Sequence, residues 1–484
     1  MSTRFLPLWI LFCAWVALAQ SSRMFTPTGS MIELRSQHTA TLLLDGRVLV
    51  AGGYGARGDG LASAEIYDPS TGAFTATETM TTPRRMHSST LLADGRILIA
   101  GGYSLGTPSA SAEIYEPASG TFSATGNLTF PRGGHTAILL SSGKVLIIGG
   151  YGSPGFPLVA PAEIYDPAAG LFTATESYQG DGGCDFCAPA VLLADDTVLF
   201  AGQNQAQLYD PASAVFSLTG TGSPCLSPAT LLLDGKVLFA GGECEGREAT
   251  AELYDPATGA FNFTGSMGSP RVWHSLTLLP DGTVLAAGGE TDSCSSRGCS
   301  FAGTVASAEL YDPSTAAFAP TGSMTTAREG HTATLLNDGT VLIAGGTSYG
   351  GIGVLFGDAA TAEIYTPALM VPAPQLFALS TDGTGQGAIW HATTGEVASR
   401  SNPALAGEVL SMYTCNLIAG AVIPPQVAIG GQLAKILYFG DAPGYPGYYQ
   451  VNFKIPDGVA SGSAVSVRLR YLERPSNEIT IAVQ

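Results

Sequence analysis

Five histidines in this chain each follow an arginine by three residues, a spacing whose side chains could bind a metal or exchange protons. The pairs are Arg35/His38, Arg84/His87, Arg132/His135, Arg271/His274 and Arg328/His331. Because the spacing returns at equivalent positions of a repeated unit, we interpret these residues as structural and expect no metal site. A buried arginine needs an anionic partner. We expect these partners to be the glutamates that recur later in each unit: Glu65, Glu113, Glu163, Glu309 and Glu363.

Two of the repeated units lack this pattern. The fourth unit has "CDFCAP" where the others carry arginine and histidine, and Gln207 replaces its glutamate. The fifth unit lacks arginine and histidine but keeps Glu252, for which Arg247 is a candidate partner. The joint loss of Arg, His and Glu in the fourth unit favours the interpretation that these residues act together.

Two short motifs near the first unit have familiar functional meanings elsewhere. Gly53 to Gly58 fits a nucleotide-binding pattern, but it lies between two expected strands, whereas such a motif needs a helix N-terminus to hold the pyrophosphate. The Arg57-Gly-Asp59 tripeptide fits an adhesion motif and has no counterpart in the other units. We interpret both as chance matches.

Seven of the eight cysteines lie beyond the first nineteen residues, and their spacing does not suit a zinc site, because no histidine lies near a second ligand pair. We predict disulfides instead. The candidates are Cys184, Cys187, Cys225, Cys244, Cys294 and Cys299. Cys415 has no obvious partner.

The N-terminus and the overall charge limit where the protein works and what it binds. Residues 1–19 read as a signal peptide, with Arg4 before an apolar run and Ala17-Leu-Ala19 as the cleavage site. We therefore expect a secreted or periplasmic protein with no membrane span. The formal net charge of -18 argues against nucleic-acid partners, because phosphate binding requires clustered Lys and Arg.

The elements that carry these residues are strands. An apolar strand ending in glycine, such as "RVLVAGG", occurs seven times and is followed by a strand such as "AEIYDP". The period of roughly 40 to 57 residues is typical of four-stranded propeller blades. The sequence predicts an all-β protein with a seven-bladed β-propeller over residues 20–369. The expected outer strand occurs only six times within the repeats, so we predict that residues 25–31 supply the outer strand of the last blade.

The repeat resembles the kelch family of β-propellers, through its Arg-x-x-His, diglycine and Tyr-Asp-Pro elements. Residues 370–484 lack the repeat and alternate like a small Ig-like β-sandwich, similar to a domain found on secreted bacterial proteins. Together the two domains resemble the galactose oxidase architecture. That resemblance implies copper held by two Tyr and two His, one Tyr directly preceding a His, yet the chain contains no Tyr-His pair and only His391 lies outside the repeat.

We therefore favour a binding or scaffold module for an extracellular glycan or protein, with a copper-radical oxidase as the alternative. We number the four strands of a blade 1 to 4 from the axis outward. The 2–3 loop joins the second and third strands, and the 4–1 loop joins the fourth strand to the first strand of the next blade. Both kinds of loop lie on one face of the propeller, and here their lengths vary widely, as is common for functional loops. Tyr54, Tyr103 and Tyr151 follow the diglycines of three successive units on this face. They are either an aromatic arc for sugars or peptides, or packing residues for neighbouring loops. We expect a monomer without a cofactor.

Overall fold

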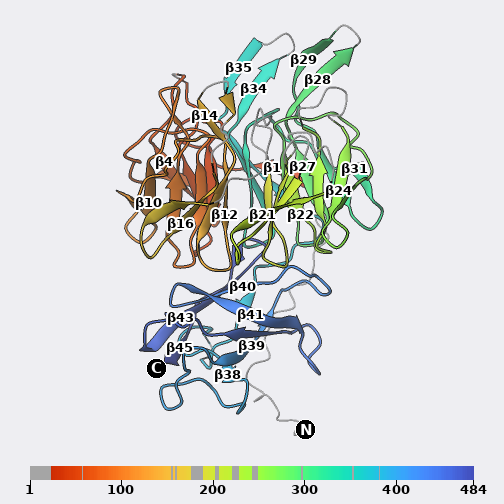
Figure 1. Ribbon diagram of the computed structural model, residues 1–484. Helices are drawn as coiled ribbons and strands as arrows, with labels where there is room; N and C mark the ends of the chain where they lie inside the picture. Colours follow the sequence, from red (N-terminus) through yellow and green to blue (C-terminus); the bar gives the residue numbers. More distant parts are fainter. Residues whose placement is uncertain are drawn as a thin grey trace.

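The computed structural model describes residues 23–484 except 57, 154–155, 158–160, 176–188, 202–205, 221–227, 243–248, 296–297, 351–353 and 381. None of the described residues forms a helix long and apolar enough to cross a membrane. The prediction of an all-β, seven-bladed propeller is confirmed, because seven four-stranded antiparallel sheets follow one another along the chain. Figure 1 shows these blades above a second, smaller β domain.

Each blade runs from an inner strand near the axis to an outer edge strand. Blade 1 contains β2 (Thr39–Leu42), β3 (Val48–Ala51), β4 (Ala64–Asp68) and β5 (Ala73–Ala76). Blade 2 contains β6 (Ser88–Leu91), β7 (Ile97–Ala100), β10 (Ala112–Glu116) and β11 (Thr121–Ala124), and blade 3 contains β12 (Thr136–Leu139), β13 (Val145–Ile148), β16 (Glu163–Asp166) and β17 (Leu171–Ala174). Blade 4 contains β18 (Ala190–Leu192), β19 (Val198–Ala201), β20 (Ala206–Asp210) and β21 (Val215–Thr219).

The remaining blades follow the same order. Blade 5 contains β22 (Ala229–Leu231), β23 (Val237–Ala240), β24 (Ala251–Asp255) and β25 (Ala260–Phe263), and blade 6 contains β26 (Ser275–Leu278), β27 (Val284–Ala287), β30 (Ala308–Asp312) and β31 (Ala317–Pro320). Blade 7 contains β32 (Thr332–Leu335), β33 (Val341–Ala344), β36 (Ala362–Thr366) and β1 (Met24–Pro27). The second strand of every blade is fully buried, which explains its near-continuous apolar sequence.

The last blade joins the two ends of the propeller. The N-terminal strand β1 pairs antiparallel with β36, and Phe25 lies opposite Tyr365 with ring centroids 4.8 Å apart. Beyond the strand, the backbone N–H groups of Thr28 and Met31 donate to the carbonyls of Ala362 and Ala360. Closing a propeller in this way protects an edge strand that would otherwise be exposed.

Adjacent blades are also joined by a repeated aromatic motif. In blade 1 the Tyr67 and Phe74 rings lie 4.8 Å apart, and the Tyr67 hydroxyl bonds the Thr28 hydroxyl at 3.0 Å. Similar Thr–Tyr bonds hold five further blades: Thr77–Tyr115, Thr125–Tyr165, Thr219–Tyr254, Thr264–Tyr311 and Thr321–Tyr365. The Tyr of the Tyr-Asp-Pro motif therefore links each of these blades to the end of the preceding outer strand.

Hairpins of varied length project from one face of the propeller. They are β8 (Tyr103–Ser104) with β9 (Thr107–Pro108), β14 (Tyr151–Ser153) with β15 (Phe156–Pro157), β28 (Glu290–Ser295) with β29 (Gly298–Thr304), and β34 (Thr347–Gly350) with β35 (Val354–Asp358). Each connects the second and third strands of its blade. We call the face formed by these connections and the 4–1 loops the variable face; it lies at the top of Figure 1, opposite the C-terminal domain.

The C-terminal domain is a curled sheet that folds onto itself like a β-sandwich. Its strands are β37 (Gln375–Leu376), β38 (Ile389–His391), β39 (Val409–Cys415), β40 (Gln426–Ile429), β41 (Gln432–Asp441), β42 (Tyr449–Lys454), β43 (Gly462–Tyr471), β44 (Arg474–Pro475) and β45 (Ile479–Val483). The long strand β41 pairs with β40 at its start and with β42 along the rest, so it carries the sheet around one core.

This domain contacts the face of the propeller that holds the short turns between first and second strands. The Val422 N–H donates to the Leu233 carbonyl at 2.9 Å, and the Ala373 N–H donates to the Asn337 carbonyl at 2.6 Å. The C-terminal domain therefore packs on the face opposite the variable face.

Candidate functional site

The repeated arginines form a buried clamp within each of five blades. Arg35 has no exposed surface; its Nη2 donates to Glu65 Oε1 at 2.7 Å and its Nη1 to the Gly52 carbonyl at 2.7 Å. Glu65 in turn accepts from the backbone N–H groups of Ile32 and Glu33 in the loop that enters the blade. The other pairs, at 2.7 to 3.0 Å, are Arg84–Glu113, Arg132–Glu163, Arg271–Glu309 and Arg328–Glu363. Each clamp fixes a 4–1 loop to its own blade.

The repeated histidines form a second set of contacts, between neighbouring blades around the axis. In each case Nε2 of one histidine hydrogen-bonds the hydroxyl that follows the histidine of the preceding blade. These bonds, 2.9 to 3.0 Å long, are His38–Thr332, His87–Thr39, His135–Ser88 and His331–Ser275. The His38–Thr332 bond joins blade 1 to blade 7, so this set also closes the propeller.

Burial keeps these histidines neutral. Desolvation, with a smaller contribution from the neighbouring arginines, lowers the pKa of His135 and His331 to about 3 and that of His38 and His87 well below the ordinary value. A neutral imidazole satisfies the observed hydroxyl contact with one ring nitrogen. These side chains are therefore committed to inter-blade packing.

The diglycine that occurs in six of the seven units is required by the same contacts. Gly52 has a φ of +61°, and a Cβ there would lie 2.5 Å from the Arg84 carbonyl and 2.7 Å from Cε1 of His87. Gly53, with a φ of +105°, would clash with the Ser36 carbonyl at 2.7 Å. Gly52 lets the end of the second strand lie close to the Arg-x-x-His segment of the next blade, and Gly53 lets it lie close to that of its own blade.

Blades 4 and 5 interrupt this arrangement. A Cβ on Gly149, which faces blade 4, would lie 3.4 Å from the Phe200 ring. Blades 4 and 5 have Pro189 and Pro228 where the other five blades have the hydroxyl residue, and among the described residues neither ring nitrogen of His274 has a hydrogen-bond partner.

On the variable face the residues before the five repeated histidines are linked by backbone hydrogen bonds into a chain that runs around part of the ring, from blade 6 through blades 7, 1 and 2 to blade 3. Met86 N–H donates to the Gln37 carbonyl at 3.0 Å, Gln37 N–H to that of Gly330 at 3.0 Å, and Gly330 N–H to that of Trp273 at 3.2 Å. Gly134 N–H extends the chain by donating to Met86 at 2.8 Å. All five residues have a positive φ of 51 to 69°, a strained conformation for the non-glycine members. These bonds place Gln37, Met86 and Trp273 around the propeller axis, and we call the surface formed by these three residues the axial mouth.

Next to this chain of backbone hydrogen bonds, Arg85 lies between two of the three tyrosines. Its Cζ lies 5.2 Å from the ring centroid of Tyr54 and 5.5 Å from that of Tyr103, within cation–π range. Nη1 donates to the Gln37 side-chain oxygen at 3.0 Å. We call Arg85, Tyr54, Tyr103 and Gln37 the Arg85 stack. It leaves guanidinium N–H groups available, since no other acceptor is bonded to Arg85 among the described residues.

The three tyrosines differ in how much of each ring a ligand can reach. Tyr54 is half-buried, whereas Tyr103 and Tyr151 are 8 % and 7 % exposed. Tyr103 packs against Gly133 of the next blade, where a Cβ would lie 2.4 Å from the ring. Tyr54 is therefore the tyrosine best placed to contact a ligand directly, and Tyr103 supports Arg85 from behind.

Sequence reasoning missed Arg85, Gln37, Met86 and Trp273. A signal for them was present: the two residues between the repeated arginine and histidine read SQ, RM, GG, VW and EG, whereas the residues on either side repeat. Variable positions inside a constant frame are typical of a binding surface on a scaffold.

Most of the predicted cysteine sites cannot be placed, because Cys184, Cys187, Cys225 and Cys244 lie outside the described residues. The backbone register of β28 and β29 puts Cys294 opposite Cys299 across the hairpin. Cys415, for which the sequence offered no obvious partner, is disulfide-bonded.

The described residues do not assemble a set of copper ligands. No group of three His, Cys, Asp or Glu side chains that could hold a metal occurs among them. The one histidine outside the repeat, His391, is 4 % exposed and bonds Glu408 Oε1 through Nδ1 at 2.5 Å and the Asn402 carbonyl through Nε2 at 3.0 Å. Both of its ring nitrogens are thus engaged within the C-terminal domain.

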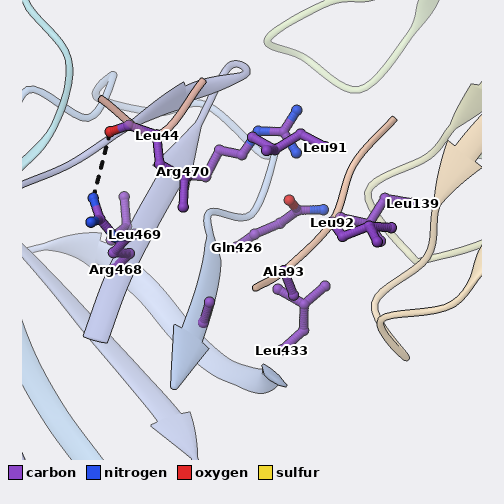
Figure 2. Close-up of a pocket in the computed structure, with 11 residues that line it drawn as sticks. Leu44, Leu91, Leu92, Ala93, Leu139, Gln426, Leu433, Arg468, Leu469 and Arg470 are labelled. Atoms are coloured by element: carbon purple, nitrogen blue, oxygen red, sulfur yellow. Dashed lines mark hydrogen bonds between the residues drawn. The ribbon is translucent and has the colours of Figure 1, made fainter. Parts of the chain in front are cut away.

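A small cavity lies between the two domains, away from the variable face. Figure 2 shows Leu91, Leu92 and Leu139 on the propeller side and Leu433 and Arg470 on the other. An Arg468 N–H donates to the Leu44 carbonyl at 3.5 Å beside it. The mostly apolar lining indicates an interface between domains, not a polar active site.

Comparisons with known proteins support the fold. Residues 35–81 match the Kelch motif, which confirms the resemblance seen in the repeat. A solved structure described as a novel fungal alcohol oxidase with catalytic diversity among the AA5 family, in complex with copper, is similar with a TM-score of 0.62. At 19 % identity, over 96 % of this chain and 100 % of that one, the likeness shows a shared fold. No curated protein matches the sequence.

Proposed function

We propose that this protein is an exported binding or scaffold module whose variable face holds an extracellular glycan or protein. The observation that carries the proposal is the Arg85 stack beside the axial mouth. Two tyrosine rings and the Gln37 amide hold the guanidinium in one place, so less conformational entropy is lost when a ligand binds it.

The chemistry of the mouth suits a ligand with both polar and apolar surfaces. Tyr54 and Trp273 can cover the apolar face of a sugar ring or a peptide side chain. Arg85 and Gln37 can bond hydroxyl or carbonyl oxygens. The net charge of -18 favours neutral ligands over polyanionic glycans, since like charges oppose association.

Glycan-array screening together with a pull-down from the native secretome tests this proposal. For any ligand found, we expect the Arg85→Met and Tyr54→Ala variants together to weaken binding at least about tenfold, because each 1.4 kcal/mol is a factor of ten in Kd. Arg96→Met is the matched control, since Arg96 pairs with Asp94 on the opposite face of the propeller. A ligand whose affinity is unchanged by the double variant but lost on deleting residues 371–484 would refute the proposal.

A copper-radical oxidase is the second candidate, on the strength of the fold shared with the fungal alcohol oxidase. The described residues do not fit it, because five of their six histidines are bonded between blades or within the C-terminal domain, and no group of three potential ligands includes the sixth, His274. Copper reconstitution followed by a peroxide-release assay on galactose and simple alcohols separates the two candidates. We expect only background release, whereas robust turnover would favour the oxidase.

Export, local disulfides on the variable face and a monomeric state belong to the same proposal. We expect mass spectrometry of the mature protein to find an N-terminus directly after Ala19. Non-reducing peptide mapping should find disulfides among the candidate cysteines, and six free thiols at these positions would contradict the prediction. Light scattering should give the mass of one chain.

A further inference from the structure

One cationic side chain of the blades pairs with no carboxylate among the described residues. Ten lysines and arginines of residues 24–366 lie in the described part of the chain. Nine of them pair with an aspartate or glutamate at 2.6 to 3.8 Å: Arg35, Arg47, Arg84, Arg96, Arg132, Lys144, Lys236, Arg271 and Arg328. The tenth is Arg85, which contacts two tyrosine rings and the Gln37 amide. The chain has 39 acidic residues for 21 basic ones, so a shortage of acids does not explain this exception.

The backbone holds Arg85 and both tyrosines in place on the variable face. Arg85 and Tyr103 exchange two backbone hydrogen bonds, at 3.1 and 2.8 Å, and Ser36 and Tyr54 exchange two at 3.1 and 2.6 Å. The Arg85 side chain is half-buried, so part of it is open to solvent. The guanidinium is therefore positioned before any ligand arrives, which lowers the entropy lost on binding.

The contacts of the Arg85 guanidinium leave one of its edges unused. Nη1 donates to Oε1 of Gln37 at 3.0 Å, whereas Nε and Nη2 donate to no acceptor among the described residues. Nε and Nη2 form one side of the planar group, and their spacing matches the two oxygens of a carboxylate. The Gln37 oxygen is neutral, so the positive charge stays uncompensated. A carboxylate on a ligand would form charge-assisted hydrogen bonds here, which are roughly twice as strong as bonds between neutral groups.

We infer that the Arg85 stack selects a sugar that carries a carboxylate, a uronic acid, over the corresponding neutral sugar. This inference rests on the proposed function and names the ligand class of the same site. The carboxylate bonds Nε and Nη2 of Arg85, while the half-buried Tyr54 ring covers the apolar face of the sugar. The net charge of -18 opposes a polyanion, but it opposes a single carboxylate at Arg85 much less, because charges farther away than about 8 Å are largely screened at physiological salt.

Matched glycans test this inference on the full chain. Glycans that end in glucuronic or galacturonic acid are compared with the same glycans after reduction of the carboxyl group to a primary alcohol. We expect the acid forms to bind at least about tenfold more tightly at low salt, because hydrogen bonds to charged groups are stronger than those to neutral ones, and this preference should shrink as salt rises. Arg85→Gln should remove the preference, and Arg85→Lys, which keeps the charge but loses the planar fork, should keep only part of it. Arg96→Met, on the opposite face, is the control that should keep all of it.

Three results would overturn the inference. The first is equal affinity for the acid and reduced forms, and the second is a preference that persists in folded Arg85→Gln protein. In both cases, weaker binding of the two forms by Tyr54→Ala would leave the proposed function standing, whereas the absence of any ligand at the axial mouth would contradict both. The third is a preference for peptides with a free C-terminal carboxylate and none for sugar acids, which would assign the site to a protein ligand. If Arg85→Gln does not fold, the wild-type affinities for the acid and reduced forms decide by themselves.

Discussion

Replacing Arg84 with methionine should destabilise the propeller far more than the loss of one surface charge. The guanidinium donates to the Gly101 and Ser111 carbonyls at 2.8 and 2.9 Å and to Glu113 at 2.7 Å. Methionine keeps most of the side-chain volume but none of these donors. Glu113, 1 % exposed, would remain as a buried carboxylate held only by the backbone N–H groups of the 4–1 loop.

Breaking a buried ion pair by removing one partner typically costs about 3–5 kcal/mol. With an unfolding entropy of about 2.1 cal/mol/K per residue over roughly 340 residues of propeller, each kcal/mol lowers Tm by about 1.4 °C. We therefore expect Arg84→Met to lower Tm by about 4–7 °C in a thermal scan monitored by circular dichroism.

A double variant and a surface control make this result interpretable. Adding Glu113→Gln removes the uncompensated charge, so the double variant should lose less than the sum of the two single variants. Arg96→Met, which breaks an exposed pair with Asp94, should change stability by about 1 kcal/mol or less. A shift below about 1 °C for Arg84→Met, or strict additivity in the double variant, would refute the view that these pairs clamp the blades.

Three further predictions follow from the same structure. Deleting residues 24–27 removes the outer strand of blade 7 and should lower Tm markedly. An unchanged Tm would show that the propeller does not need this strand. Burial lowers the pKa of His135 to about 3, so between about pH 6.5 and pH 3 this histidine takes up a proton only in the unfolded state. The free energy of unfolding is therefore highest above about pH 6.5 and falls on acidification, by about 1 kcal/mol per pH unit for each such histidine. His135→Gln should flatten this slope in Tm measured from pH 7 to 5, and an unaltered slope would contradict the assignment. Burial opposes the charged form of His391, but the hydrogen bonds to Glu408 and Asn402 outweigh burial and raise its pKa. The stabilisation that His391 provides is therefore complete below about pH 6.5 and is lost as the pH rises through the pKa of the folded state. Hydrogen exchange over residues 392–408 should accelerate with pH by more than the intrinsic rate, and Glu408→Gln should abolish this excess.

The fold followed from the sequence because its repeats encode the same contacts seven times. The Tyr of Tyr-Asp-Pro bonds the end of the preceding outer strand, and the first glycine of the diglycine fits against the next Arg-x-x-His segment. Both contacts depend on local spacing, so counting copies was enough to predict blades and to infer that the N-terminus supplies a strand.

The candidate site was predicted less well, because it depends on contacts between units that the repeat does not encode. Tyr103 follows a diglycine just as Tyr54 does, yet it is buried against Gly133 of the next blade, a contact set by the absence of a side chain there. Arg85 occurs once at its position, so repetition gave it no weight.

Hydrogen–deuterium exchange with the tightest-binding glycan from the array tests the central claim most directly. The account predicts protection at residues 36–38, 54 and 85–87, around the axial mouth and the Arg85 stack, and unchanged exchange in residues 371–484. Protection confined to residues 371–484, with the mouth unaffected, would contradict the claim that the variable face of the propeller is the binding surface.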